Sequence, residues 1–133
     1  MNASIGTMRL NLPAPLEIAF EEAEAAALRG EVPVGAVVAD KAGNVIAKAG
    51  NRTLELKDPT AHAEMLVIRA AAEILGSERL IDCDLHVTLE PCAMCAGAIS
   101  HARIGRLVFG AEDPKGGAVV NGPRFFDQPT CHW

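Results

Sequence analysis

The chain has 133 residues, half of them hydrophobic, with 12 basic and 17 acidic residues and a formal net charge of −5. This length suits one domain with one core, the hydrophobic content excludes a disordered chain, and the acidity disfavours general nucleic-acid binding. No apolar run is long enough to cross a membrane and residues 1–16 lack a signal-peptide pattern, so we expect a cytoplasmic protein.

The first half of the chain predicts a helix, a β-hairpin and a second helix. Apolar residues recur at helical spacing over 15–29, and a continuous apolar run over 34–39 is typical of a strand covered on both faces. Turn residues over 40–44 join this run to a second strand over 45–49. The next helix, over 62–75, is apolar on most sides, as a buried helix is.

The second half continues with a strand over 85–89, a helix over 92–102 and a strand over 106–110. After Gly110, glycine and proline residues predict loops. Strand–helix–strand therefore occurs twice, and each such crossover joins parallel strands. We expect an α/β fold, namely a three-layer α/β/α sandwich whose first strand runs antiparallel to the others.

Two short motifs carry the chemistry, His62-Ala63-Glu64 and Pro91-Cys92-Ala93-Met94-Cys95. Both lie at strand-to-helix junctions, which share the carboxyl edge of a parallel sheet. A histidine with two thiolates binds zinc well, and a Cys₂His set leaves a fourth position for water, as in a catalytic site. Cys92 and Cys95 share one face of a helical turn, whereas His62 and Glu64 reach one site only if their helix points its N-terminus at it.

Both predicted helices have start signals. Thr60 is a suitable cap for the helix over 62–75, and Pro91 suits the first helical position or the turn just before it. Cys83 and Cys131 read as a small buried residue and a tail thiol, although either could close the zinc site as a fourth ligand. His86 lies on the other strand face, so we expect a hydrogen-bonded structural histidine there.

A zinc with one open position lowers the pKa of its water to about 7 and holds a hydroxide near neutral pH. Glu64 follows a ligand closely enough to take the water proton and deliver it to a leaving group. A hydroxide with a proton shuttle suits hydrolytic loss of ammonia from an amidine-like carbon. The H-x-E…P-C-x-x-C spacing is typical of zinc-dependent nucleobase deaminases.

Longer stretches extend this match: Glu31-Val32-Pro33-Val34-Gly35-Ala36-Val37, Asn51-Arg52, Asp58-Pro59-Thr60-Ala61-His62-Ala63-Glu64, residues 89–98 and Phe109-Gly110-Ala111. Through them the chain resembles the zinc-dependent cytidine/deoxycytidylate deaminase superfamily, and closely the bacterial tRNA-specific adenosine deaminases. The segment 103–118, with Asp113 and Lys115, is similar to the tRNA enzymes in particular.

The resemblance implies a cytidine deaminase-like mixed sheet of at least four strands in the order 2-1-3-4, within a single deaminase domain over 1–133. It implies one Zn²⁺ per chain held by His62, Cys92 and Cys95, with Glu64 as proton shuttle. The implied reaction is hydrolytic deamination of adenosine to inosine at the wobble position of a tRNA anticodon, by a homodimer that binds the anticodon stem-loop and no membrane.

Substrate residues follow from the same resemblance. Asn51 matches the position that contacts the target base or its ribose, and Asp113 lies in a loop near the substrate; their ordinary interpretations are a strand-ending turn residue and a loop acid. The full set of substrate candidates is Asn51, Ala63, Asp113, Arg52 and Lys115, and the basic candidates for RNA contacts are Arg52, Lys57, Lys115 and Arg124. The family usually continues into a fifth strand and a C-terminal helix, which we expect to be absent here.

Two alternatives remain at the level of sequence. A deaminase of a free base or nucleoside, of guanine or cytidine type, would share the chemistry without an RNA-binding face. A structural zinc domain or a silent RNA-binding subunit would not be an enzyme. A fourth protein ligand would indicate the structural site, and loss of the shuttle carboxylate would indicate the silent subunit, but Glu64 is present.

Overall fold

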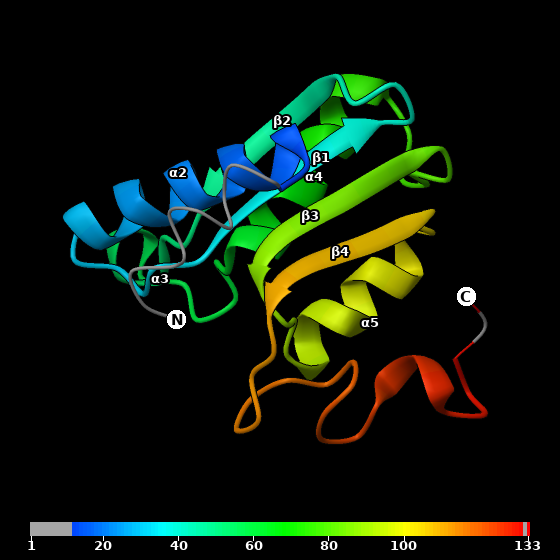
Figure 1. Ribbon diagram of the computed structural model, residues 1–133. Coiled ribbons are helices and arrows are strands. Elements are labelled where there is room, and N and C mark those ends of the chain that lie inside the picture. The colour runs from blue at the N-terminus through cyan, green and yellow to red at the C-terminus, as the bar shows by residue number, and fades with distance from the viewer. Residues whose placement is uncertain (1–11, 132) are drawn as a thin grey trace.

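The computed structural model describes residues 12–131 and 133 and has a four-stranded sheet at its centre, in the order β2-β1-β3-β4 (Figure 1). The strands are β1 (Gly35–Asp40), β2 (Val45–Gly50), β3 (Cys83–Leu89) and β4 (Arg106–Ala111). β1 runs antiparallel to β2 and to β3, whereas β3 and β4 are parallel. The predicted strand order and directions are confirmed.

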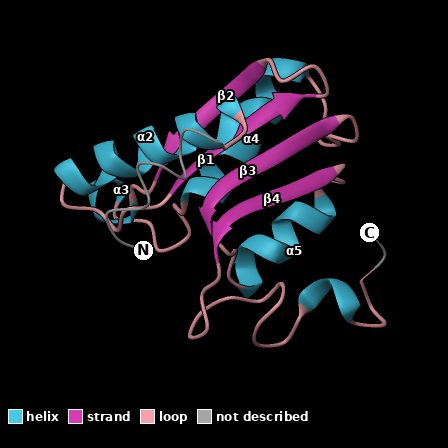
Figure 2. Cartoon of the chain, viewed as in Figure 1, coloured by secondary structure: helices cyan, strands magenta, loops and turns pink. Residues whose placement is uncertain are grey.

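Helices cover both faces of this sheet (Figure 2). They are α2 (Ala14–Leu28), α4 (Ala63–Leu75) and α5 (Ala93–His101), with a short α3 (Thr53–Leu56) and a 3₁₀ turn η1 (Phe125–Asp127). Successive side chains of a strand point to opposite faces, so β1 serves two layers. Val37 and Ala39 pack with α2, whereas Ala36 and Val38 pack with the α4 side. The three-layer α/β/α sandwich is therefore confirmed.

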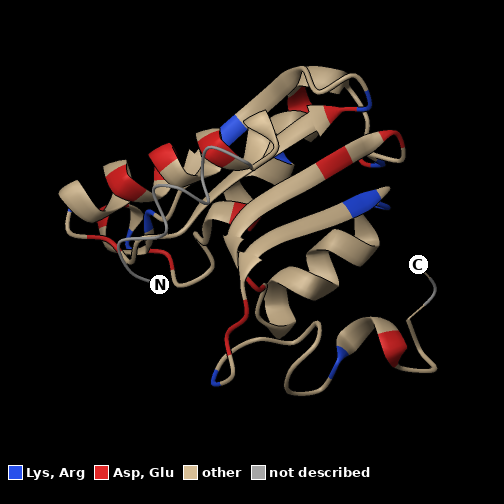
Figure 3. Ribbon diagram, viewed as in Figure 1, with Lys and Arg blue, Asp and Glu red and all other residues tan. Residues whose placement is uncertain are grey.

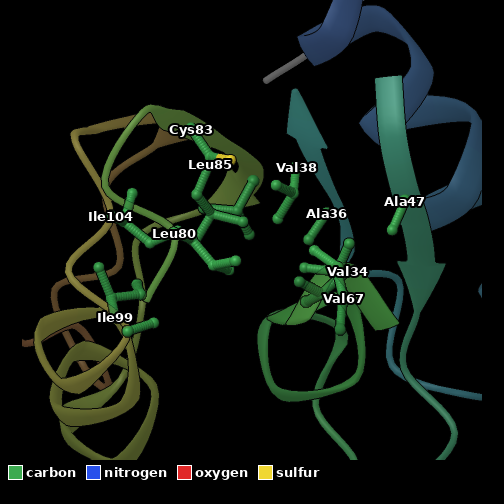
Figure 4. Packing of buried hydrophobic residues seen from close by; sticks show 14 residues of the cluster. Val34, Ala36, Val38, Ala47, Val67, Leu80, Cys83, Leu85, Ile99 and Ile104 are labelled. Atoms are coloured by element: carbon green, nitrogen blue, oxygen red, sulfur yellow. The ribbon is translucent and has the colours of Figure 1, made fainter. Parts of the chain in front are cut away.

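The larger core lies between the sheet and the pair α4 and α5. Side chains of β1 and β3 converge there with Val67 of α4 and Ile99 of α5 (Figure 4). Val38, Leu85 and Val67 are wholly buried. Burying a side chain of this size stabilises a protein by about 1.5–3 kcal/mol, so this layer anchors the two helices that carry the predicted metal ligands.

Every predicted helix and strand is present to within two residues at each end, but α3 and η1 were not predicted. Thr60 does not cap α4, because its hydroxyl and N–H both donate to Asp58 Oδ1, and His62 occupies the N-cap position instead. Pro91 takes the second of its two predicted places, just before the N-cap Cys92 of α5.

His86 differs from the expectation of a hydrogen-bonded histidine. Its side chain is 2% exposed, and its Nδ1 has no hydrogen-bond partner among the described residues. The residue lies between Val37 and Val108 on the α2 side of the sheet, and the charges of Asp84 and Arg106 act on its pKa in opposite directions. Burial lowers the pKa of His86, which keeps the ring neutral in these surroundings.

Within the described residues, no helix combines the length and apolarity that crossing a membrane would require. The expectation that residues 1–16 carry no signal peptide falls mainly on residues 1–11, which lie outside the described part of the chain.

The packing of α2 on β1 leads to a stability prediction. A β-carbon on Gly35 would lie 2.0 Å from the Ala19 carbonyl oxygen and 2.5 Å from the Ala23 nitrogen, so Gly35→Ala must push α2 off the sheet. We expect it to lower the free energy of unfolding by about 3 kcal/mol, at the upper end of typical over-packing. Urea unfolding followed by circular dichroism measures this change.

Gly97→Ala in α5 is the matched control. Its β-carbon would meet nothing closer than the Phe125 ring at 3.9 Å, so we expect unchanged stability or a gain of up to about 1 kcal/mol from helix propensity. Equal losses in the two variants would contradict the close approach of α2 to β1.

Candidate active site

Two helices begin at one edge of the sheet, because β2 and β3 both run antiparallel to β1 and therefore end on the same side. The chain leaves β3 at Leu89 and starts α5 with Cys92 as N-cap. It leaves β2 at Gly50 and, after α3, starts α4 with His62 as N-cap. The predicted meeting of the two motifs at the carboxyl edge is confirmed.

His62, Cys92 and Cys95 form a cluster whose ligand atoms all lie within 4.8 Å of one another. His62 Nδ1 is 3.5 Å from Cys95 Sγ and 3.7 Å from Cys92 Sγ. Tetrahedral zinc, with Zn–N of about 2.0–2.1 Å and Zn–S of about 2.3 Å, would hold nitrogen and sulfur about 3.6 Å apart. These three residues therefore fit a zinc ion without rearrangement.

Neither remaining cysteine joins this cluster among the described residues. Cys83 is the first residue of β3, at the opposite end of the strand from Leu89. The Cys131 sulfur contacts the Ser100 hydroxyl at 3.5 Å, on the last turns of α5. The sequence-based idea that Cys83 or Cys131 closes a four-ligand structural site is therefore wrong.

The two thiols share one negative charge. A hydrogen bond with Cys95 and the N–H groups at the start of α5 outweigh burial and lower the pKa of Cys92 to about 5. That bond to Cys92 and burial raise the pKa of Cys95. A divalent cation between the sulfur atoms would take the place of the proton that they share and would stabilise both thiolates, which favours metal binding by this pair.

Glu64 is the second residue of α4, and it is 4% exposed at the wall of a cavity that also touches His62 and Cys92. Burial, reinforced by the neighbouring Cys92 thiolate, raises the pKa of Glu64. A raised pKa makes a carboxylate a better proton acceptor than an ordinary carboxylate, which suits a general acid–base residue.

The cavity has a volume of about 230 Å³, and five segments of the chain line it. Val32 and Val34 precede β1, and Thr53 follows β2. The two metal motifs form the floor, and Asp113 and Gly116 come from the loop after β4. Apolar and polar groups thus converge above the ligand cluster, as in binding sites for small organic groups.

Asn51 lines the cavity and also holds α4 in place. Its Oδ1 accepts the Ala63 N–H at 2.7 Å, and its own N–H donates to the Val34 carbonyl at 3.1 Å. The first N–H groups of a helix have no partner within the helix, so Asn51 supplies one for α4. Ala63 is fully buried with its N–H already bonded, and it does not line the cavity.

The other three predicted substrate residues differ in whether they line the cavity. Asp113 lines the cavity, and its Oδ1 accepts the N–H groups of Lys115 and Gly116, each at 3.1 Å. Arg52 and Lys115 do not line it, and the Arg52 guanidinium instead bonds Glu55 at 2.7 and 2.9 Å. The substrate roles of these residues stay predictions.

Two buried carboxylates near the cavity were not predicted. Glu31, 6% exposed, accepts the N–H groups of Leu54 and Glu55 and so holds α3. Glu90, 2% exposed, binds the loop that carries Asp113. A charged residue at the end of an apolar strand, just before Pro91, was the signal that could have pointed to Glu90.

Comparison with known proteins agrees with this geometry. The sequence profile of the cytidine and deoxycytidylate deaminase zinc-binding region matches residues 13–111. The chain therefore belongs to this family of zinc-dependent deaminases. The matched span contains all three ligands of the cluster, as well as Glu64.

Within the family the chain is similar to tRNA-modifying enzymes. It is 64% identical to a tRNA-specific adenosine deaminase of Agrobacterium fabrum over 117 residues, which are 88% of this chain and 76% of that protein. A solved structure from studies of A-to-I editing by tRNA:A34 deaminases matches with a TM-score of 0.86 and 64% identity, covering 89% of this chain and 90% of the other. A guanine deaminase from Bacillus subtilis matches with a TM-score of 0.71 and 37% identity, covering 84% and 66%.

The ligand cluster predicts one zinc per chain. Cys92→Ser should lose nearly all of it, because losing a ligand weakens binding by more than the roughly 10–100-fold that loss of a supporting residue costs. Cys83→Ala should keep the metal, since Cys83 lies outside the cluster. Metal analysis by mass spectrometry on purified protein measures both, and zinc loss confined to the Cys83 variant would reverse the assignment.

Proposed function

We propose that this protein converts adenosine to inosine at the wobble position of a tRNA anticodon. The chemistry is supported by the buried Glu64 carboxyl beside a cluster whose distances suit zinc. The substrate is supported by 64% identity to a tRNA-specific adenosine deaminase over 88% of this chain.

The protein's own groups perform the proton transfers. Zinc held by His62, Cys92 and Cys95 would supply a Lewis acid that makes water nucleophilic near neutral pH. Glu64 takes a proton from the attacking water as the new C–O bond forms at the amidine-like carbon. The same carboxyl then delivers a proton to the amino group as the C–N bond breaks and ammonia leaves, and its raised pKa suits both steps.

The cavity suits one base rather than a longer piece of RNA. Its volume of about 230 Å³ lies below the roughly 300–1,000 Å³ of sites for drug-sized ligands. The remainder of an RNA must then lie outside, so the target base has to leave its stack to reach Glu64. A base in a loop is already partly unstacked, which favours an anticodon-like substrate over a duplex.

Charge on the surface points to few RNA contacts. Acidic residues follow one another along α2, whereas basic residues are dispersed (Figure 3). Of the four basic candidates, Arg52 pairs with Glu55 and Arg124 pairs with Asp127. Lys57 and Lys115 make no ion pair with the residues that the structure describes, so they are the basic side chains most available to phosphates.

We also propose that the enzyme acts in the cytoplasm as a homodimer. A reducing compartment keeps Cys92 and Cys95 available as thiolates. Leu28 at the end of α2 is 91% exposed and Leu54 in α3 is 69% exposed, so both apolar side chains are available to a second chain. Sedimentation velocity at micromolar concentration should give the mass of two chains.

Replacing the shuttle carboxyl should separate chemistry from folding. Glu64→Gln keeps the size of the side chain, but the amide cannot carry the proton. We therefore expect the zinc content and the unfolding midpoint to equal those of the wild type, and turnover to fall by about 10⁴-fold. Glu73→Gln, at an exposed position of the same helix, is the matched control and should keep full activity. At least half of normal turnover in the Glu64 variant would remove this residue from the mechanism.

The substrate is tested by comparing an anticodon stem-loop with free adenosine, guanine and cytidine in one buffer. We expect inosine to form on the stem-loop with kcat/KM at least about 100-fold above that of any free compound, because contacts outside the cavity add binding energy to the reaction. Binding should weaken only shallowly with salt, since each neutralised phosphate of a single strand adds about 0.7 to the slope. Efficient conversion of a free base, with no gain from the stem-loop, would favour a small-molecule deaminase instead.

A further inference from the structure

The loop after β4, residues 112–121, is attached to one buried carboxylate. Glu90 Oε1 accepts the Asp113 N–H at 3.0 Å and the Asn121 side-chain amide at 2.6 Å. Glu90 Oε2 accepts three backbone N–H groups, from Val119 and Val120 at 2.9 Å and from Asn121 at 3.0 Å. One side chain at the end of β3 thus bonds both ends of the loop.

These bonds replace the solvent that Glu90 has lost. The residue is 2% exposed, and none of the salt bridges among the described residues involves it. Burial alone would raise the pKa of Glu90, but the hydrogen bonds from Asp113, Asn121 and Val119 outweigh it and lower the pKa to about 2. A buried charge without such donors is strongly unfavourable, so the carboxylate and the loop stabilise each other.

The attached loop faces the cavity. Asp113 and Gly116 line it, next to Glu90 itself, and Asp113 Oδ1 binds the N–H of Gly116. The N–H of Ala118 donates to the Pro91 carbonyl at 2.9 Å, which ties the middle of the loop to the metal motif. Gly117 packs so closely on the carboxylate that a β-carbon there would lie 2.4 Å from Glu90 Cδ.

We propose that Glu90 is a positioning residue that holds loop 112–121 as a preformed wall of the substrate site. This inference rests on the proposed function, because the wall would contact the part of a stem-loop next to the target base. A loop that is ordered before binding adds no ordering free energy to the binding step. If only a fraction of molecules carried the ordered loop, the apparent affinity for substrate would fall by that fraction.

Loss of Glu90 can lower activity through the loop or through the metal site. If Glu90 acts through the loop, its loss weakens substrate binding, but the enzyme saturated with substrate reacts normally. KM then rises and kcat is unchanged. Acting through the metal ligand two residues away, its loss would lower zinc content and kcat together. The two mechanisms therefore differ in the split between KM and kcat and in metal content.

Two variants disturb the loop independently. Glu90→Gln offers one carbonyl oxygen and one amide, and the amide would face N–H donors of the loop instead of accepting from them. Gly117→Ala leaves Glu90 intact and drives a methyl group into its carboxylate. Glu112→Gln is the matched control, because the bond given for this exposed acid among the described residues is a 3.3 Å contact with the Asn121 amide.

Loop order is measured directly by limited trypsin digestion of the full chain, followed by mass spectrometry of fragments cut after Lys115. Lys115 is exposed at the tip of the loop, so the rate of this cut reports loop opening. We expect the cut to be about tenfold faster in Glu90→Gln and in Gly117→Ala than in the wild type, and unchanged in Glu112→Gln. This measurement needs no substrate and remains decisive if the wild type proves inactive on RNA.

Steady-state kinetics on the anticodon stem-loop, with zinc content measured on the same samples, complete the test. We expect KM to rise about tenfold in both loop variants, with kcat within about twofold of wild type and one zinc per chain. Wild-type cleavage rates in both variants would overturn the proposal, as would faster cleavage with an unchanged KM. A fall in kcat with loss of zinc would assign Glu90 to the metal site instead.

Discussion

The common direction of β2 and β3 is the constraint on which the site depends. Both strands run antiparallel to β1, so both deliver the chain to one edge of the sheet. The helices that follow begin there with His62 and Cys92 as their N-caps, and a single helical turn adds Cys95. Packing of Val67 and Ile99 against the strands then holds the three ligand atoms at distances that suit zinc.

Two buried glutamates, Glu64 and Glu90, line the cavity and a third, Glu31, lies next to its wall residue Val32; their surroundings give them different tasks. Glu64 is buried without enough donors to offset the loss of water, so its pKa rises and it can exchange protons. Glu90 is at least as buried, yet donors from the loop keep it ionised and make it an anchor. Glu31 resembles Glu90, since bonds from α3 overcome its burial and lower its pKa. The balance between loss of solvent and the N–H donors that reach each carboxyl decides whether its pKa rises or falls.

Local patterns were sufficient to predict most of the fold. The apolar run of β1 and the helical spacing of α2 and α4 place these elements to within two residues. The ligands could be predicted too, because zinc requires particular side chains at short spacings and the strand–helix junctions place them at one edge. Short elements were missed, since α3 depends on Glu31 to accept its first N–H groups rather than on any pattern of its own.

The sequence by itself determined the three residues predicted to bind zinc and the carboxyl beside them, because each follows from side-chain chemistry at short spacings. Periodicity placed the helices and strands, whereas the order of the strands came from the resemblance to the deaminase superfamily. Only the tertiary structure decided that Glu90 holds the cavity loop, that Asn51 holds the start of α4, and that His86 Nδ1 is buried without a partner among the described residues. Glu90 and Asn51 bond to backbone N–H groups far along the chain, and every residue except proline carries such a group. A backbone donor leaves no mark in the sequence, so its partner becomes visible only when the chain is folded.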